Sequence, residues 1–265
     1  MINMSRLKKA TEYVEKKLKF KGETAIILGS GLGNVSDGLS KKKKIEYAKI
    51  PFYPKSTIKG HAGELVTGEF GGKEILIANG RFHLYEGYSE NEISFPFNVF
   101  KNIGVKNIII TNSSGSLNKK NSPGTLMAIN GHLDFTFKES YKNPEKIKGE
   151  KYYSPKLLKL AKEVSRASNI KLAQGIYCWT FGPLYETASE VSYFQSLGGN
   201  AVGMSGIPEI KICSTFGFSI LVISSLTNYG AGISKEVLNH GDVLLSAMKN
   251  KQKLIQLLLG IIEGI

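Results

Sequence analysis

The sequence predicts an α/β protein: a three-layer sandwich with a central mixed β-sheet flanked by helices. Short, nearly all-apolar runs alternate with longer stretches of helical periodicity along the chain. Such runs are typical of strands that are buried on both faces, and their alternation with helices places helical layers on the two sides of the sheet. The 265 residues are 42% hydrophobic and 22% charged, which suffices for a full core. We therefore expect a single domain over residues 1–265.

The periodicity assigns the elements in order. An amphipathic helix over residues 5–20 places Leu7, Ala10, Val14 and Leu18 on one face. Residues 65–70 and 74–78 flank Gly71-Gly72 as the two arms of a hairpin. Further apolar runs predict strands at 24–28, 107–111, 172–177 and 218–226, and helical patterns cover 90–103, 155–168, 187–197, 208–216 and 234–262.

The net charge of +13 comes from 35 Lys and Arg against 22 Asp and Glu, and a nucleic-acid-binding protein is one way to explain it. Much of the excess lies in Lys41-Lys42-Lys43-Lys44 and in residues 138–162, which we interpret as solvated loop and helix surface. Neither segment has the interleaved aromatics on which single-stranded nucleic acids stack. A positive field also favours encounter with a small anion.

Cysteine usage and the chain start indicate a cytoplasmic protein. Cys178 and Cys213 lack the paired spacing of a disulfide framework or a zinc site, so we expect a reducing compartment and no metal. The first residues, MINMSRLKK, do not form the apolar stretch of a signal peptide, and no later run is long enough to span a membrane.

A glycine-rich turn, Gly29-Ser30-Gly31-Leu32-Gly33, follows the first predicted strand. Its third glycine comes one residue too early for a dinucleotide-binding loop, and no Gly-Lys-Ser or Gly-Lys-Thr follows to make a P-loop. The turn is either a tight strand-to-helix connection or a cradle in which backbone N–H groups and the Ser30 hydroxyl hold an anion.

Polar side chains gather at the carboxyl ends of the predicted strands, where α/β proteins usually bind ligands. Arg81 and His83 lie on alternate residues and point the same way in an extended chain, which makes a cationic pair suited to phosphate. Taken singly, Arg81 fits a surface ion pair and His83 a satisfied core histidine. Ser30, Ser113 and Ser205 at other strand ends favour the phosphate site, because four loops then supply donors without a competing carboxylate. Glu186, before the helix near residue 187, is either favoured by the helix dipole or accepts N–H groups of a ligand.

Several motifs, taken together and in this order, resemble the purine nucleoside phosphorylase family, in its low-molecular-mass trimeric class. They lie between about residues 24 and 245: residues 27–33, Gly60-His61-Ala62-Gly63, residues 80–88, Thr111-Asn112 with Gly115, Gly182-Pro183 with Glu186-Thr187, residues 201–205, Pro208-Glu209, Thr227-Asn228 and Asn239-His240.

The resemblance implies the fold of that family, a homotrimer, purine nucleosides as substrates and inorganic phosphate as co-substrate without a further cofactor. It implies a phosphate site made by Ser30, His61, Arg81, His83, Ser205 and the backbone at Ser113. Ribose would contact Tyr85, the Met204 backbone and, at its 5′-hydroxyl, His240. The purine would contact Glu186 and Asn228, with Tyr185 beside its ring, and His83, Glu186 and Asn228 would be the catalytic residues.

This assignment makes physical sense, because phosphorolysis cleaves the ribose C1′–purine N9 bond through an oxocarbenium-like transition state. Phosphate stabilises that charge and is itself the nucleophile. An ionised Glu186 accepts from the N1–H of a 6-oxopurine but faces a lone pair in adenine, so we expect inosine and guanosine to be preferred over adenosine. Methylthioadenosine phosphorylase is the alternative within the same chemistry, and Asn228 and His240 argue against it.

The sequence also departs from the family pattern. Ser113-Ser114-Gly115-Ser116 replaces the usual Ala-Ala-Gly-Gly and brings hydroxyls near the phosphate and the base. Gly131 stands where an acid often precedes the histidine equivalent to His132. The insertion that carries an aromatic residue to the neighbouring subunit is shortened between Phe137 and Ser154, which leaves Tyr152 or Tyr153 as substitutes.

Overall fold

The computed structural model describes residues 3–29, 33–55, 62–138, 144–234 and 240–265, with the side chains of residues 33, 34 and 240–249 outside the description. The helices are α1 (Met4–Leu18), α2 (Glu90–Asn102), α3 (Pro155–Ala167), α4 (Ala188–Ser196), α5 (Ile207–Thr215) and α6 (His240–Gly264). The strands are β1 (Thr24–Ile27), β2 (Ser40–Glu46), β3 (Glu64–Phe70), β4 (Lys73–Asn79), β5 (Asn107–Ser116), β6 (Leu126–Asp134), β7 (Leu172–Trp179), β8 (Ala201–Gly203) and β9 (Ser219–Tyr229).

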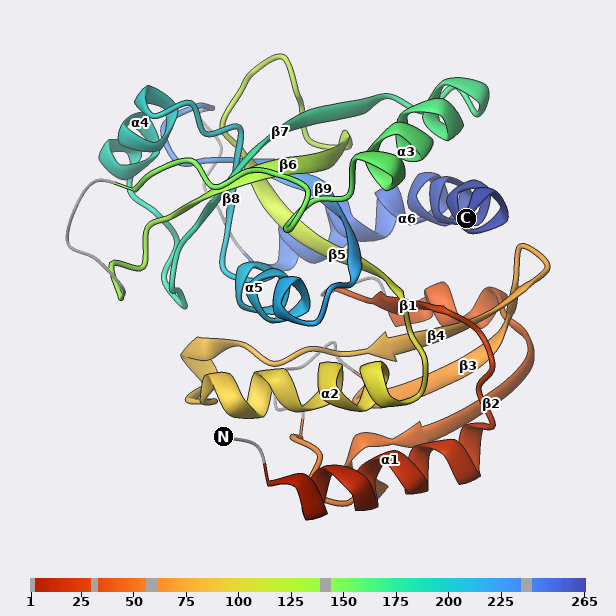
Figure 1. Cartoon of the computed structure of the whole chain (residues 1–265). Helices are drawn as coiled ribbons and strands as arrows, with labels where there is room; N and C mark the ends of the chain where they lie inside the picture. The colour runs from red at the N-terminus through yellow and green to blue at the C-terminus, as the bar shows by residue number, and fades with distance from the viewer. Residues whose placement is uncertain (1–2, 30–32, 56–61, 139–143, 235–239) are drawn as a thin grey trace.

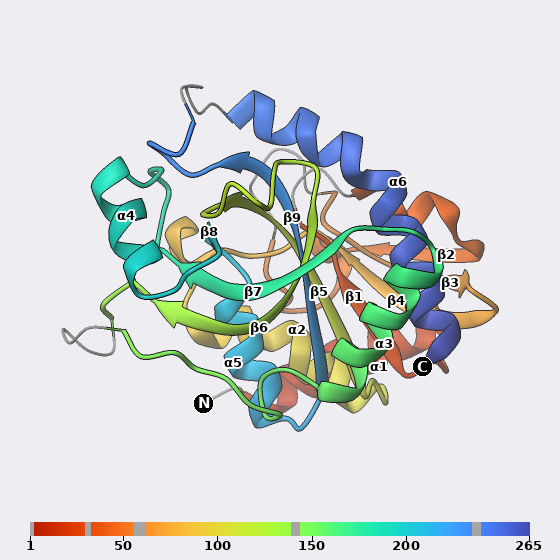
Figure 2. The ribbon, with the colours of Figure 1, turned by 90° about the horizontal axis from the view of Figure 1, so that it is seen from above.

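Strands β1, β5 and β9 lie between two apolar cores. In β1, Ala25 and Ile27 face the core under α1, α2 and α5, whereas Ile26 and the next residue after the strand, Leu28, face the core under α3 and α6. The alternation repeats in β5 and β9, because successive side chains of a strand point to opposite faces. Figures 1 and 2 show the helices on both sides of the sheet. The predicted three-layer α/β sandwich is thereby confirmed.

The sheet is mixed and half of it closes on itself. The described strands follow the order β2-β3-β4-β1-β5-β8-β7-β6-β9, and β9 also pairs with β5. The pairs β1–β4, β1–β5, β5–β9, β6–β7 and β7–β8 are parallel, whereas β2–β3, β3–β4, β5–β8 and β6–β9 are antiparallel. Strands β5 to β9 therefore form a small closed ring beside the open half of the sheet. This closure is a feature that the sequence patterns do not predict.

Three strands were not predicted. Lys41-Lys42-Lys43-Lys44 lies in the edge strand β2 and not in a loop. Its exposed lysines reach carboxylates of β3, with 2.6 Å between Lys41 Nζ and Glu69 Oε1, and charged lysines protect an edge strand from pairing with other chains. Strand β6 contains Asn130, Gly131 and His132, which interrupt the apolar run that would have revealed it. The short strand β8 precedes Ser205.

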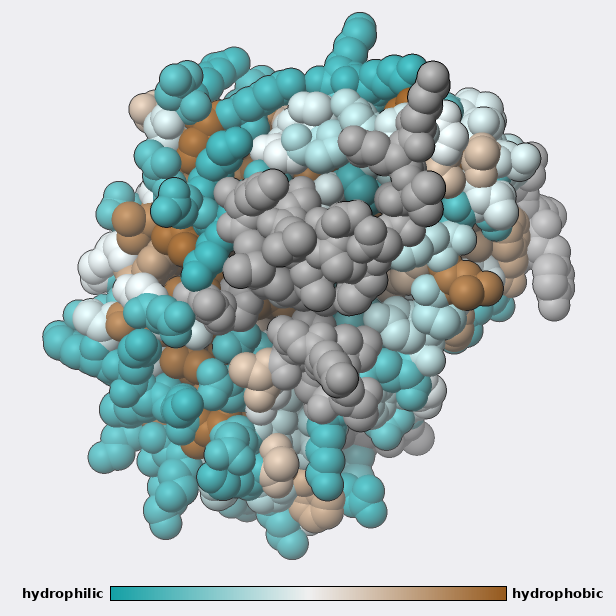
Figure 3. All heavy atoms as spheres, turned by 180° about the vertical axis from the view of Figure 1, so that it is seen from behind, coloured by the Kyte–Doolittle hydropathy of each residue, from teal (hydrophilic) through white to brown (hydrophobic). Residues whose placement is uncertain are grey.

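The last helix is predicted from residue 234, but that residue lies in a bend, and the described helix α6 starts at His240. None of the described helices combines the length and the apolar character that crossing a bilayer would require. Seen from behind, the surface outside the grey atoms is mostly hydrophilic, with apolar residues exposed in small groups (Figure 3).

Candidate active site

A cavity of about 310 Å³ opens where β4, β5, β7, β8 and β9 end, within the range of roughly 300–1,000 Å³ that small-molecule sites occupy. It brings together the following predicted site residues: Arg81, His83, Tyr85, Ser113, Tyr185, Glu186, Met204, Ser205 and Asn228. Segments from opposite parts of the chain meet here because Gly115 of β5 pairs with both Asn228 of β9 and Val202 of β8. Ser30 and His61 lie outside the described residues, as does the side chain of His240.

One end of the cavity holds a buried arginine. Arg81 is only 2% exposed, and its Nη1 donates to Ser205 Oγ over 2.9 Å. Its Nε lies 3.2 Å from Oε1 of Glu209, which is also buried. The prediction that no carboxylate competes for this cation is therefore wrong. The motif Pro208-Glu209 belongs to the resemblance, but nothing in the sequence assigns Glu209 a role.

His83 also has a carboxylate partner. Its Nδ1 lies 2.8 Å from Glu86 Oε1, and the same oxygen accepts from the His83 backbone N–H over 2.9 Å. Because a carboxylate only accepts hydrogen bonds, the proton is on Nδ1. The ring of Tyr85 stacks on His83 with 4.7 Å between centroids. Burial, and secondarily the charge of Glu86, raise the pKa of the Tyr85 hydroxyl to about 12, so it is a neutral donor at physiological pH.

The other end of the cavity carries a carboxylate and an amide. Glu186 lies just before the α4 N-cap Thr187, and its Oε1 accepts from the Thr180 hydroxyl over 2.7 Å. Burial raises the pKa of Glu186 above that of an ordinary glutamate, although the Thr180 hydrogen bond acts in the opposite direction. Asn228 Nδ2 donates to Tyr229 O and its Oδ1 accepts from Thr227 Oγ1, each over 2.9 Å, which fixes the orientation of the amide.

The serines that distinguish this chain from the family pattern have partners within the fold. Ser114 Oγ lies 2.6 Å from Ser224 Oγ, and Ser224 in turn donates to Asn112 Oδ1. Ser116 Oγ donates to Asn118 O over 2.9 Å. The Ser114 hydroxyl therefore connects β5 to β9, the Ser116 hydroxyl stays within its own segment, and the protons of both are used inside the fold.

The two candidate aromatics for a neighbouring subunit pack on their own chain. Tyr153 is buried and its hydroxyl lies 2.8 Å from His132 Nδ1. The Tyr152 ring meets His132 edge-on with 5.9 Å between centroids. Tyr153 is thus excluded as a residue that reaches across an interface.

Comparison with known proteins shows to which superfamily the chain belongs. The sequence profile of the Phosphorylase superfamily matches residues 23–263, and the chain belongs to this superfamily.

Within it, the chain belongs to the purine nucleoside phosphorylases. It is 34% identical to purine nucleoside phosphorylase 1 of Geobacillus stearothermophilus, over 99% of this chain and 98% of that one. It is 35% identical to purine nucleoside phosphorylase 1 of Bacillus subtilis, over 97% of each chain. The purine nucleoside phosphorylase of Schistosoma mansoni in complex with inosine superposes with a TM-score of 0.89 at 29% identity, over 99% of this chain and 97% of that one. Other structures of the schistosome enzyme hold hypoxanthine, guanosine or adenosine. The family expected from the motifs is confirmed.

Proposed function

We propose that this protein catalyses the reversible phosphorolysis of purine nucleosides, releasing the free base and (deoxy)ribose 1-phosphate in purine salvage. The observation that carries the proposal is one cavity with a buried arginine–serine pair at one end and a glutamate–asparagine pair at the other. A phosphate dianion fits the first end, and the hydrogen-bonding edge of a 6-oxopurine fits the second. The inosine and guanosine complexes of the schistosome relative support the choice of substrates.

In the proposed mechanism, Arg81, His83, Ser205 and the Ser113 backbone hold phosphate against the ribose. Phosphate forms the new bond to C1′ while the bond between C1′ and purine N9 breaks, and the electron pair passes to the base. Asn228 donates to N7 as that nitrogen becomes more basic, and Glu186 accepts from N1–H. The protein thus acts by position and electrostatics and needs no nucleophile of its own.

The remaining expected contacts complete the proposal. Ser30 and His61 close the phosphate site, Tyr85 and the Met204 backbone hold ribose hydroxyls, and His240 holds the 5′-hydroxyl. Tyr185 lies beside the purine. Phosphate is a co-substrate and no cofactor is required. We place the enzyme in the cytoplasm as a homotrimer.

The test incubates purified protein with inosine, guanosine, adenosine and methylthioadenosine, each with and without phosphate. We expect phosphate-dependent release of hypoxanthine and guanine to be fastest. Preferential cleavage of methylthioadenosine would favour that phosphorylase instead. No base release from any substrate, together with a salt-dependent shift of labelled DNA, would favour a nucleic-acid-binding protein.

A further inference from the structure

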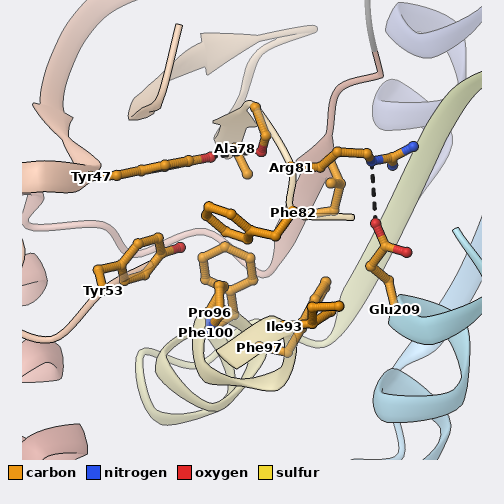
Figure 4. Close-up of a pocket in the computed structure, with 12 residues that line it drawn as sticks. Tyr47, Tyr53, Ala78, Arg81, Phe82, Ile93, Pro96, Phe97, Phe100 and Glu209 are labelled. Carbon is orange, nitrogen blue, oxygen red and sulfur yellow. Dashed lines mark hydrogen bonds and ion pairs between the residues drawn. The ribbon is translucent and has the colours of Figure 1, made fainter. Parts of the chain in front are cut away.

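Glu209 is a buried carboxylate on the α5 side of Arg81, and neither the motif analysis nor the mechanism gives it a role. It is 3% exposed and comes from the first turn of α5, whereas Arg81 follows β4. Figure 4 shows the glutamate pointing at the guanidinium from the helix. The ion pair therefore connects two elements that both border the cavity.

Glu209 is itself held in place by the backbone. Its Oε2 accepts from the N–H of Gly206, the N-cap of α5, over 2.8 Å, and its Oε1 faces Arg81 Nε at 3.2 Å. Gly206 adopts a φ of 94°, a conformation that favours glycine and lets the chain turn from Ser205 into the helix. One short turn thus presents both Ser205 and Glu209 to the same guanidinium.

Nη1 of Arg81 is held by the hydrogen bond to Ser205, and Nε is held by the ion pair with Glu209 without a hydrogen bond. Nη2 is buried and has no hydrogen-bond partner among the described residues. An arginine that is fixed at two nitrogens keeps the rest of its planar fork in one direction. Arg81 lines the cavity, so its guanidinium borders the space that a ligand would occupy.

The other side of Arg81 is nearly dry. A separate cavity of about 20 Å³ lies among Tyr47, Tyr53, Phe82, Phe97 and Phe100, with Arg81 and Glu209 at its border (Figure 4). Such a volume holds about one water molecule. Solvent therefore screens the ion pair little, and removing one partner would leave a buried charge that has no compensation.

We propose that Glu209 is a positioning residue, which holds Arg81 so that its free donor meets the phosphate co-substrate. The proposal rests on the proposed function. Glu209 does not touch phosphate: it acts through Arg81, and the α5 turn couples this orientation to that of Ser205. Phosphate then binds to an arginine that is already oriented and has little rotamer freedom left to lose.

The test compares Glu209→Gln and Glu209→Asp with wild type in the full chain. Gln keeps the side-chain length but not the charge, and Asp keeps the charge but falls short of Arg81 Nε. The matched control is Glu92→Gln, because Glu92 Oε2 likewise accepts from the N-cap N–H of its helix, Ser89, over 2.8 Å but has no arginine partner. Titration calorimetry with inorganic phosphate and steady-state kinetics with inosine are the two measurements.

We expect both Glu209 variants to raise the phosphate Kd and KM about tenfold or more while the inosine KM stays within about twofold. Glu92→Gln should leave all three values unchanged. Wild-type phosphate affinity in both Glu209 variants would overturn the proposal, and so would a parallel rise of both KM values, which marks a merely structural role. If wild type itself bound no phosphate, the proposed function would fail as well, so the two failures are distinguishable.

Discussion

At the scale of single residues, Glu186 connects burial to pH dependence. The acceptor role proposed for Glu186 toward purine N1–H requires the ionised form, and burial raises its pKa. As pH falls through this raised pKa, the carboxylate is protonated and the contact is lost. We expect kcat/KM for inosine to decline on the acid side at a pH above the titration of an ordinary glutamate. A pH–rate profile of wild type against Glu186→Gln measures this decline.

Glu186→Gln should lose this decline of kcat/KM at low pH, the acid limb of the profile. Its kcat/KM for inosine should also fall about tenfold to a hundredfold, as for the loss of a charged hydrogen bond of about 1.5–3 kcal/mol. Thr180→Val removes the hydroxyl that stabilises the ionised form over 2.7 Å and should shift the limb to higher pH. The raised pKa also means that ionised Glu186 destabilises the fold once pH rises through that pKa, so Glu186→Gln should melt higher at neutral pH. Identical pH profiles in all three proteins would exclude this role.

In the proposed mechanism, Asn228 selects among purines through its hydrogen bond to N7. In Asn228→Asp the new carboxyl faces the Tyr229 carbonyl, to which the amide now donates over 2.9 Å. That neighbour favours the protonated acid, and its one proton, which the Tyr229 carbonyl accepts in the free enzyme, can be donated instead to N7 of a bound adenine. We expect the ratio of kcat/KM for adenosine over inosine to rise about tenfold, the value of one hydrogen bond of about 1.4 kcal/mol. Asn98→Asp is the control, since Asn98 also donates to a carbonyl, Ser94 O, at 2.9 Å in α2; an equal ratio in both variants would contradict the role.

His132, which lies outside the cavity, makes the stability of the fold depend on pH. Burial and, secondarily, the charge of Lys211 lower its pKa to about 4, while the charge of Asp134 acts in the opposite direction. Its neutral form is thus favoured in the fold, so its contribution is fully present above about pH 6.5 and is lost as pH falls toward about 4. The loss is on the order of 3 kcal/mol, by the conversion of 1.36 kcal/mol per pKa unit. Urea unfolding of wild type and His132→Gln across this range should show a flatter pH dependence in the variant; parallel curves would refute the assignment.

At the scale of elements, Gly29 allows close contact between β1 and β5 at the cavity end of the sheet. A Cβ at this position would lie 2.8 Å from both the Asn112 Cα and the Thr111 carbonyl oxygen, which are backbone atoms that cannot move aside. We expect Gly29→Ala to cost about 1–3 kcal/mol in urea unfolding and to raise the phosphate KM. Gly38→Ala is the control, because its Cβ would meet only Phe70 Cε2 at 3.6 Å. Equal stability of the two variants would show that this contact does not matter.

The same elements show what a sequence can and cannot predict. The apolar runs of β1, β5 and β9 are visible because both faces of these strands are buried. Strand β2 is invisible, since its lysines face solvent and only its pairing with β3 makes it a strand. The family motifs locate the cavity residues, but the pairing of Arg81 with Glu209 joins positions 128 apart in the sequence through tertiary structure alone.

At the scale of the whole molecule, the described surface exposes large apolar side chains, some of them in the segment around Pro183 that borders the cavity. Leu184 is 83% exposed, and Tyr185, Phe181, Phe137 and Tyr193 are exposed as well. Pro183 and Tyr185 also line the cavity, so the patch continues into the site. A second copy of the chain that covers these residues would shield the site from water, which is consistent with the homotrimer proposed above.

Leu184→Glu tests this assembly. A charge at this exposed apolar residue should shift the protein from trimer to monomer in sedimentation velocity and lower kcat/KM for inosine about tenfold or more, because an interface does not tolerate an unpaired buried charge. Met4→Glu is the matched control. Met4 is 73% exposed at the start of α1, where the helix dipole favours an acidic residue. This control should remain trimeric and fully active. Two results would show that these apolar residues are not the assembly surface. One is a wild-type protein that is monomeric and fully active at assay concentration, and the other is a Leu184→Glu protein that sediments like the control.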